Sequence, residues 1–471
     1  MNLPASFIKQ TSLLMGEEEY KKLDEALNQE APVSIRLNKA KISSERYDFS
    51  FCGEFVPWCM DGHYLDRRLT FTFDPLFHAG CYYVQEASSM FVEQIIRKYV
   101  TEPSVMLDLC AAPGGKSTHA RSVLPVGSLL VANEVIRNRS QILAENLIKW
   151  GYPDVVVTNN DPTDFASLES FFDVILADVP CSGEGMFRKD PASVQEWSPE
   201  NVDICYQRQR RIINDIWKSL KPGGILIYST CTYNTKEDEE NIAWIRHEYE
   251  AESLSVDVLP EWNLTSNLMN EEFPVYRFLP HKTKGEGFFL AALRKPFDAE
   301  EEKYTIPRKK TDKKGKKEKM PEVPSQAKEW LSAPDKYFFE VCGSNVIAFA
   351  KEHADKLTAL RTSLRIVHAG ITIGELRGKD FFPDHSLAMS SELNRSAFFA
   401  VEVTYEQAIA YLRKEAISLD ETTPRGYILL LYKGIPIGFV KNIGNRANNL
   451  YPQEWRIRSG YLPEEIRCLF L

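Results

Sequence analysis

The sequence contains no apolar run that approaches the roughly 18 residues of a membrane-spanning helix, so we expect no association with membranes. Its first seven residues are not a basic segment followed by a long apolar one, which argues against a secretory signal peptide. Hydrophobic residues make up 44% of the chain and charged residues 26%, as in globular proteins with an ample core. These features predict a globular protein of the cytoplasm.

Metal-binding patterns are also missing. The nine cysteines are odd in number and scattered, with no CxxC pair and no cluster of histidines beside them. We therefore expect no metal site. Apart from the two cysteines discussed below, we interpret the cysteines as small buried hydrophobic residues in a reducing compartment.

The chain has no excess of basic residues: 57 Lys and Arg stand against 66 Asp and Glu, and the net charge is -9. This balance argues against a protein that coats nucleic acid with its whole surface, although a local basic patch can still bind nucleic acid. No internal repeat occurs. At 471 residues the chain is too long for one ordinary domain, and we expect two or three.

The middle of the chain alternates between short apolar runs and helical segments. The predicted strands are residues 105–109, 128–133, 154–159, 172–177 and 224–228. Helical patterns lie between them, notably at 137–149 and 202–220. This alternation predicts a parallel sheet with helices on both faces. Two further strands, 275–279 and 287–293, would close the sheet as an antiparallel hairpin, which is the layout of seven-stranded, Rossmann-like methyltransferases.

Changes in composition divide the chain into five parts. A small α/β extension precedes the α/β core, a basic segment without apolar periodicity follows it, and strand patterns return in two α+β C-terminal domains. The predicted boundaries are 1–75, 76–297, 298–324, 325–395 and 396–471. The basic segment is interpreted as a flexible linker, with contact to RNA phosphates as the alternative role.

Two cysteines follow two of the buried strands. Cys181 lies just after the apolar run 172–176, and Cys231 just after the run 224–228. Because ligands of parallel sheets bind at the carboxyl ends of the strands, both thiols should reach the same cleft. Asp178 lies beside them in sequence. Two thiols and a carboxylate in one cleft predict covalent chemistry.

A glycine-rich loop follows the first strand of the core. Gly114, Gly115 and Lys116 connect that strand to a helix, but the spacing matches neither GxGxxG nor the P-loop. The two glycines allow a ligand to approach the backbone closely. The helix N-terminus and the lysine favour a carboxylate rather than a triphosphate.

Acidic residues follow the next two strands. Glu134 is about twenty residues beyond the glycine turn, where it could accept both hydroxyls of a ribose. Asp161 follows the third strand and could accept the amino group of an adenine. A carboxylate, a ribose and an adenine together describe S-adenosylmethionine. The alternative is that these acids only cap helices.

Four segments resemble one known family. They are DLCAAPGGKS (108–117), ADVPCSGEG (177–185), STCTYN (229–234) and RFLPHKTKGEGFF (277–289). The chain resembles the Sun-type RNA (cytosine-5) methyltransferases, and within them the bacterial RsmF subgroup with its extra C-terminal domains. The resemblance is good over residues 1 to about 295 and weaker beyond. Ser117 departs from the threonine that is frequent in the family.

The resemblance implies a role for each matching residue. Cys231 would be the nucleophile, Cys181 would assist product release, and Asp178 would serve both the reaction and the cofactor site. The reverse assignment, with Cys181 attacking, is the alternative. The cofactor residues implied are Cys110, Ala111, Ala112, Pro113, Gly114, Gly115, Lys116, Glu134, Asp161 and Asp178.

The resemblance also implies the overall function. We expect an S-adenosylmethionine-dependent enzyme that methylates carbon 5 of a cytosine in RNA, in 16S rRNA or the small ribosomal subunit. The N-terminal extension would bind RNA, the last domain would be PUA-like, and the protein would act as a monomer. The alternatives are the same chemistry on tRNA or on another rRNA site, and a ribosome-assembly factor that binds RNA without catalysis.

Overall fold

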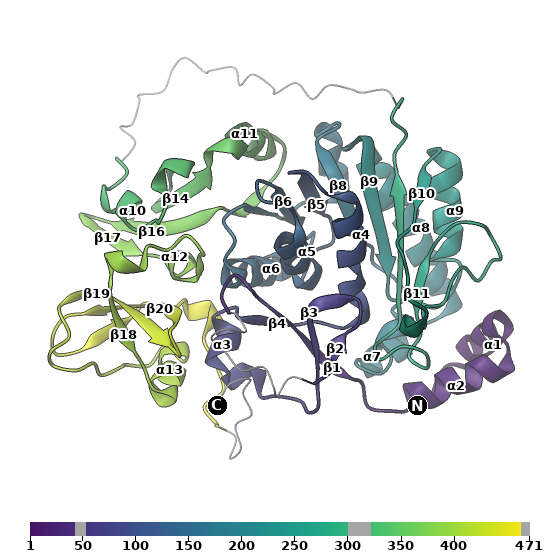
Figure 1. Ribbon diagram of the computed structural model, residues 1–471, viewed down its shortest axis with the longest axis horizontal. Helices are drawn as coiled ribbons and strands as arrows, with labels where there is room; N and C mark the ends of the chain where they lie inside the picture. Colours follow the sequence, from purple (N-terminus) through teal and green to yellow (C-terminus); the bar gives the residue numbers. More distant parts are fainter. Residues whose placement is uncertain (43–52, 300–321, 463–471) are drawn as a thin grey trace.

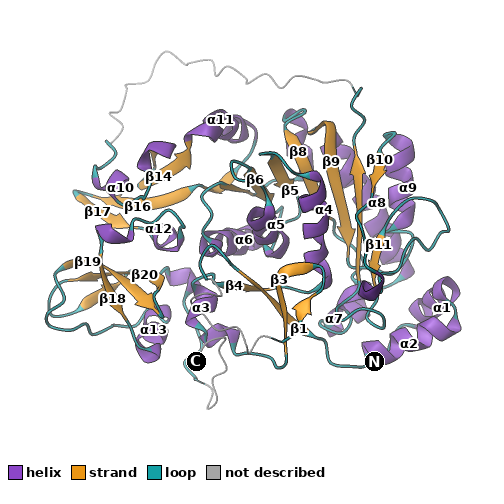
Figure 2. Ribbon diagram, in the orientation of Figure 1, coloured by secondary structure: helices purple, strands orange, loops and turns teal. Residues whose placement is uncertain are grey.

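The computed structural model describes residues 1–42, 53–299 and 322–462. Its centre is a nine-stranded sheet with helices on both faces (Figures 1 and 2). The other sheets have four strands each and come from the N-terminal and C-terminal parts of the chain. Within the described residues, no helix has both the length and the apolar character needed to cross a bilayer.

Five parallel strands form the middle of the large sheet. They are ordered β7-β6-β5-β8-β9. Their bounds are Val105–Asp108 (β5), Leu129–Asn133 (β6), Val155–Thr158 (β7), Phe172–Asp178 (β8) and Leu220–Thr230 (β9). Val, Ile and Leu dominate these strands and are buried on both faces, as parallel strands require.

Antiparallel strands complete one side of the sheet. β12 (Phe288–Arg294) pairs with β9, and both β10 (Glu252–Leu254) and β11 (Tyr276–Phe278) pair with β12. The predicted closing hairpin is therefore present. This arrangement confirms the predicted seven-stranded, Rossmann-like α/β core.

Helices cover the two faces of the sheet (Figure 2). One face packs against α4 (Val92–Tyr99), α5 (Gly115–Val123) and α6 (Arg137–Trp150). The opposite face packs against α8 (Pro199–Trp217) and α9 (Glu239–Glu248). α8 begins sharply because Pro199 follows Ser198, whose hydroxyl accepts the backbone N–H of Asn201.

The N-terminal part consists of two helices and a small sheet ordered β2-β3-β1-β4. The elements are α1 (Ala5–Met15), α2 (Glu17–Leu27), β1 (Val33–Leu37), β2 (Phe55–Val56), β3 (Cys59–Leu65), α3 (Pro75–His78) and β4 (Tyr82–Val84). Because β4 pairs with β1, this fold continues past residue 75, where we placed the end of the extension.

The first C-terminal part contributes a strand to the large sheet. β15 pairs antiparallel with β7, whereas β13, β14, β16 and β17 form a separate sheet. The elements are α10 (Gln326–Glu329), β13 (Tyr337–Cys342), β14 (Asn345–Ala350), α11 (Ala354–Ser363), β15 (Ile366–Ala369), β16 (Ile371–Arg377), β17 (Asp380–Pro383) and α12 (His385–Met389).

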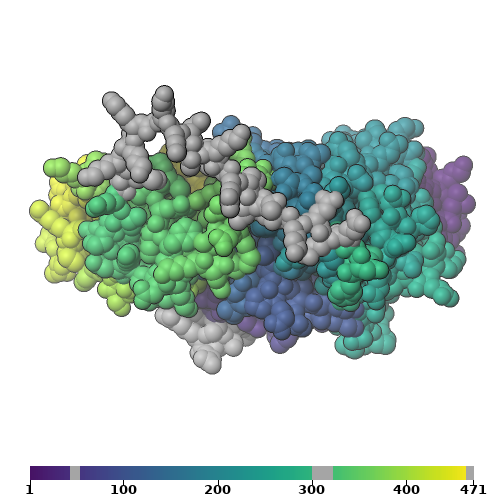
Figure 3. Space-filling view, turned by 90° about the horizontal axis from the view of Figure 1, so that it is seen from above, coloured from purple at the N-terminus to yellow at the C-terminus, as the bar shows by residue number. Residues whose placement is uncertain are grey.

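The last part forms the fourth sheet, ordered β18-β19-β20-β21. The elements are β18 (Phe399–Glu402), α13 (Tyr405–Leu412), β19 (Gly426–Tyr432), β20 (Ile435–Asn442) and β21 (Ala447–Asn449). Figure 3 shows this part at one end of the molecule and the N-terminal helices at the other. Most of the predicted linker at 298–324, namely residues 300–321, lies outside the described residues.

Candidate active site

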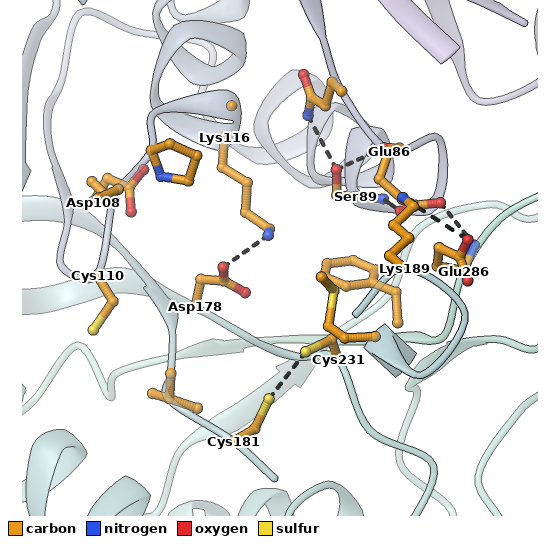
Figure 4. Close-up of a pocket in the computed structure, with 18 of the residues that line it drawn as sticks. Glu86, Ser89, Asp108, Cys110, Lys116, Asp178, Cys181, Lys189, Cys231 and Glu286 are labelled. Atoms are coloured by element: carbon orange, nitrogen blue, oxygen red, sulfur yellow. Dashed lines mark hydrogen bonds and ion pairs between the residues drawn. The ribbon is translucent and has the colours of Figure 1, made fainter. Parts of the chain in front are cut away.

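A cavity of about 430 Å³ lies at the carboxyl ends of β5, β8 and β9 (Figure 4). This is where an open parallel sheet places its ligands. Eleven of its lining residues come from the glycine loop and the strand ends: Asp108, Cys110, Ala111, Ala112, Pro113, Gly115, Lys116, Asp178, Val179, Cys181 and Cys231. The predicted thiols, carboxylate and loop therefore meet in one place.

The two thiols face each other in this cavity. Cys181 follows β8 and Cys231 follows β9, and their Sγ atoms are 3.2 Å apart. The hydrogen bond to Cys231, together with burial, raises the pKa of Cys181 well above its usual value. The Cys181 thiol therefore stays protonated at neutral pH.

Asp178 is held by two donors beside the thiols. Lys116 Nζ lies 2.8 Å from Asp178 Oδ2 (Figure 4). The Ser229 hydroxyl donates to Oδ1 at 2.7 Å. Burial opposes the charge of Lys116, but the carboxylate of Asp178 outweighs it and raises the pKa of the lysine. Lys116 therefore keeps its charge within the cavity.

The glycine loop fits a ligand that lies against the backbone. Gly114 has φ +117°, and a Cβ on Gly115 would lie 3.3 Å from Tyr83, so side chains at either position would strain or crowd the loop. Arg139 donates to the Ala112 carbonyl at 2.8 Å. At the strand end, Asp108 Oδ1 is buried and accepts no hydrogen bond from any described residue.

Glu134 and Asp161 lie outside the residues that line the cavity. Glu134 accepts the backbone N–H of Ile136 at 2.9 Å and pairs with Arg139 at 3.3 Å. Its charge still acts on the site, because it adds to burial and Asp178 in raising the pKa of Cys110. Asp161 accepts from the backbone N–H of Thr163 and so caps a short helix. Their contact with a cofactor stays a prediction.

Sequence reasoning missed several cavity residues. Asp108 ends β5 inside the glycine motif, and its position after an apolar run was the available signal. Glu86 and Glu286 also line the cavity, but they come from loops far apart in the chain. No local pattern brings such loops together.

Two arginines near these motifs have internal partners. The Arg188 side chain donates to Glu286 at 2.9 Å and to two backbone carbonyls. Arg277 is 1% exposed and pairs with Asp238 and Glu239. Arg188 therefore holds a loop that lines the cavity, whereas Arg277 ties β11 to the start of α9.

The sheet order, the glycine–lysine loop and the cavity at the strand ends define an S-adenosylmethionine-dependent methyltransferase. Three family profiles match: "16S rRNA methyltransferase RsmB/F" at 99–294, "N-terminal domain of 16S rRNA methyltransferase RsmF" at 3–87, and "Methyltransferase RsmF PUA domain" at 398–457. The chain belongs to the RsmF family of 16S rRNA methyltransferases, which confirms the resemblance seen in its motifs.

Relatives cover nearly the whole chain. "Ribosomal RNA small subunit methyltransferase F" of Aliivibrio fischeri (strain MJ11) is 32% identical over 457 residues, 91% of this chain and 92% of its own length. The protein of the same name from Klebsiella pneumoniae (strain 342) is 30% identical over 461 residues, 91% of both chains. The expectation of an enzyme of this class is confirmed.

Solved structures agree with the fold. A methyltransferase homologue from Pyrococcus horikoshii is 28% identical, with a TM-score of 0.53 over 61% of this chain and 94% of its own. NSun6 of the same organism, solved with SFG, is 22% identical, with a TM-score of 0.53 over 62% of this chain and 98% of its own. The similarity to NSun6 supports the fold alone.

Proposed function

We propose that this protein methylates carbon 5 of a cytosine in small-subunit ribosomal RNA. The observation that carries the proposal is the pair of thiols, 3.2 Å apart, in the cavity that also holds the glycine loop. A simple methyl transfer to an amine or hydroxyl needs no thiol, whereas carbon 5 of cytosine needs one to become nucleophilic. The substrate follows from the names of the full-length relatives.

Cys231 acts as the nucleophile in this proposal. Its thiolate forms a bond to carbon 6 of the cytosine, which makes carbon 5 electron-rich. When bound, S-adenosylmethionine supplies the methyl group that carbon 5 receives. Removal of the carbon 5 proton then restores the ring double bond and expels the Cys231 sulfur.

Asp178 and Cys181 manage protons during these steps. Asp178, held by Lys116 and Ser229, would hold the proton at ring nitrogen 3 that offsets the charge formed by thiol addition. Cys181 would assist the release of the product, and its raised pKa favours this role over that of attacking thiolate. If Cys181 were the nucleophile instead, Cys181→Ala would form no covalent RNA adduct, whereas Cys231→Ala would still form it.

The residues of the glycine loop fit S-adenosylmethionine. Gly114 at positive φ, the lysine and the Asp108 oxygen that has no partner among the described residues suit a ligand with a carboxylate and an amine. We propose that residues 110–116 and Asp178 hold it, with Glu134 at the ribose and Asp161 at the adenine. Each of these contacts can be tested by substitution and a binding measurement.

The remaining parts of the chain would select the RNA. We propose RNA contact for the N-terminal extension (1–75), the linker (298–324) and the last module (396–471), which the PUA-domain profile matches at 398–457. The part between them, 325–395, would dock the last module on the core. We further propose a monomer that acts in the cytoplasm.

The chemistry is tested with purified full-length protein, labelled S-adenosylmethionine and 16S rRNA from cells that lack the gene. We expect label in 5-methylcytosine and an RNA–protein adduct that survives denaturation. Cys231→Ala should abolish both, whereas Cys181→Ala should still form the adduct. Methyl transfer by Cys231→Ala at the wild-type rate would disprove the nucleophile.

A further inference from the structure

Two buried glutamates connect the loops that carry the thiols. Glu184 lies three residues after Cys181, and Glu237 lies six residues after Cys231. Both side chains are 0% exposed. Burying a carboxylate is costly unless donors surround it, so its partners show what it holds in place.

The Glu184 carboxylate binds the segment after Cys231. Its Oε2 accepts the backbone N–H groups of Tyr233 at 2.6 Å and Asn234 at 3.0 Å. Its Oε1 accepts the indole N–H of Trp197 at 3.0 Å. The next residue, Gly185, donates its backbone N–H to the Cys231 carbonyl at 2.8 Å. The loop of Cys181 therefore fixes the backbone of Cys231 and of the residues that follow it.

The Glu237 carboxylate binds the segment around Cys181. It accepts the backbone N–H of Ser182 at 3.0 Å and also the Ser182 hydroxyl. Gln209 donates to Glu237 at 2.8 Å and to the Pro180 carbonyl at 3.0 Å. The residues before and after Cys181 are thus both tied to the loop of Cys231.

We propose that Glu184 and Glu237 are positioning residues that fix the two thiols relative to each other. Each glutamate holds the backbone next to the cysteine of the other loop. The proposal rests on the proposed function, in which Cys231 attacks and Cys181 assists release. It assigns the two glutamates to different steps: Glu184 to adduct formation and Glu237 to adduct resolution.

Burial supports a role beyond packing. It raises the pKa of Glu184 to about 7, and it raises the pKa of Glu237 as well. The two acids hold backbone N–H groups that an apolar side chain would leave unpaired, and a buried N–H group without a partner is costly.

The test compares Glu184→Gln and Glu237→Gln in the full chain. In each variant an NH2 group replaces one carboxylate oxygen. A hydrogen-bond donor then faces the groups that donated to that oxygen. The assay uses S-adenosylmethionine and 16S rRNA from cells that lack the gene, and it follows both methylated product and the fraction of enzyme in a denaturation-stable RNA adduct. Cys181→Ala and Cys231→Ala provide the two reference behaviours.

We expect the two variants to move the adduct fraction in opposite directions. Glu237→Gln should slow resolution ~10-fold or more and accumulate adduct, because misplacement of a reacting group by about 1 Å costs rate steeply. Glu184→Gln should slow adduct formation by a similar factor and leave little adduct. Ser182→Ala, which removes one donor to Glu237, should accumulate adduct to a smaller extent.

Glu93→Gln is the matched control. Glu93 is also buried, but its partners His119 and Arg97 lie away from both cysteine loops. The Glu93→Gln variant should be less stable than wild type, but its adduct fraction should be unchanged. The inference is overturned if Glu184→Gln and Glu237→Gln shift the adduct fraction in the same direction, or only as far as the control does. Absence of any adduct with wild-type protein, or adduct formation by Cys231→Ala, would instead overturn the proposed function and the inference with it.

Discussion

At the scale of single residues, the site depends on charges that are paired inside the cavity. Lys116 holds Asp178, and Ser229 completes the arrangement. The identities of these three residues were visible in the motifs, but their contacts were not. Lys116 and Asp178 are 62 positions apart in sequence, and only the sheet order brings them together.

Replacing Lys116 by Met keeps much of the side-chain bulk but removes the charge beside Asp178. We expect methyl transfer to fall ~100-fold or more, the size of effect seen when a preorganised electrostatic partner is lost. Single-turnover measurements with saturating RNA would show it. Lys221→Met is the control, since Lys221 pairs with Asp173 at the far end of β8 and should transfer methyl groups normally. Equal rates for the two variants would contradict this account of Lys116.

Asp108 gives a pH-dependent prediction. Burial raises its pKa from 3.8 to about 7, so the folded protein retains a proton that the unfolded chain loses. The contribution of Asp108 to stability is therefore present at low pH and falls as pH rises from 3.8 to about 7. Asn has no such proton, so Asp108→Asn should gain stability relative to wild type across this window. Urea-unfolding midpoints of both proteins against pH measure the difference, and a constant difference would refute the prediction.

At the scale of secondary-structure elements, the strands follow from the sequence more readily than the loops do. Apolar runs bounded by turn residues marked β5 to β9 and hence the edge on which both cysteines lie. β15 was not predicted, because four residues without clear alternation give no strand signal of their own. It forms because β7 offers an unpaired edge.

Helix α1 packs against the segment that follows Cys181. Phe7 is 0% exposed and packs edge-on against Phe187 and Trp197, which follow the Cys181 loop. Phe7→Ala should cost about 3–5 kcal/mol of unfolding free energy and lower methyl transfer, because the cavity it leaves loosens this loop. Leu13→Ala on the same helix is the control: Leu13 is 77% exposed, and its loss should change stability by less than about 0.5 kcal/mol. Urea denaturation of both variants decides the point, and similar losses would contradict the role given to Phe7.

At the scale of the whole molecule, the parts of the chain share their hydrophobic cores. Phe349, Leu357, Leu360 and Ala369 pack with the methyltransferase sheet rather than with a separate core. The N-terminal sheet likewise packs with the last module, through residues such as Ile35 and Ile409. Composition and linker signals divided the chain into segments, but they carry no information about which segments share a core.

Truncation after residue 324 should therefore damage the methyltransferase core itself. It removes β15 from the edge of β7 and strips apolar contacts from one face of the sheet. We expect loss of cooperative unfolding and aggregation through the exposed edge. Gly370→Ala is a milder probe of the same junction, because Gly370 has φ +65° and a Cβ there would lie 2.3 Å from the Ala348 carbonyl oxygen. A truncated protein that unfolds cooperatively at the wild-type urea midpoint would show that the core stands alone.

Bisulfite sequencing of ribosomal and transfer RNA, from cells with and without the gene, tests the central claim most directly. We predict that one protected cytosine in the small-subunit RNA loses its protection when the gene is absent, and that wild-type protein but not Cys231→Ala restores it. Loss of protection only in a transfer RNA would contradict the proposed substrate, and an unchanged pattern in every RNA would contradict the proposed reaction.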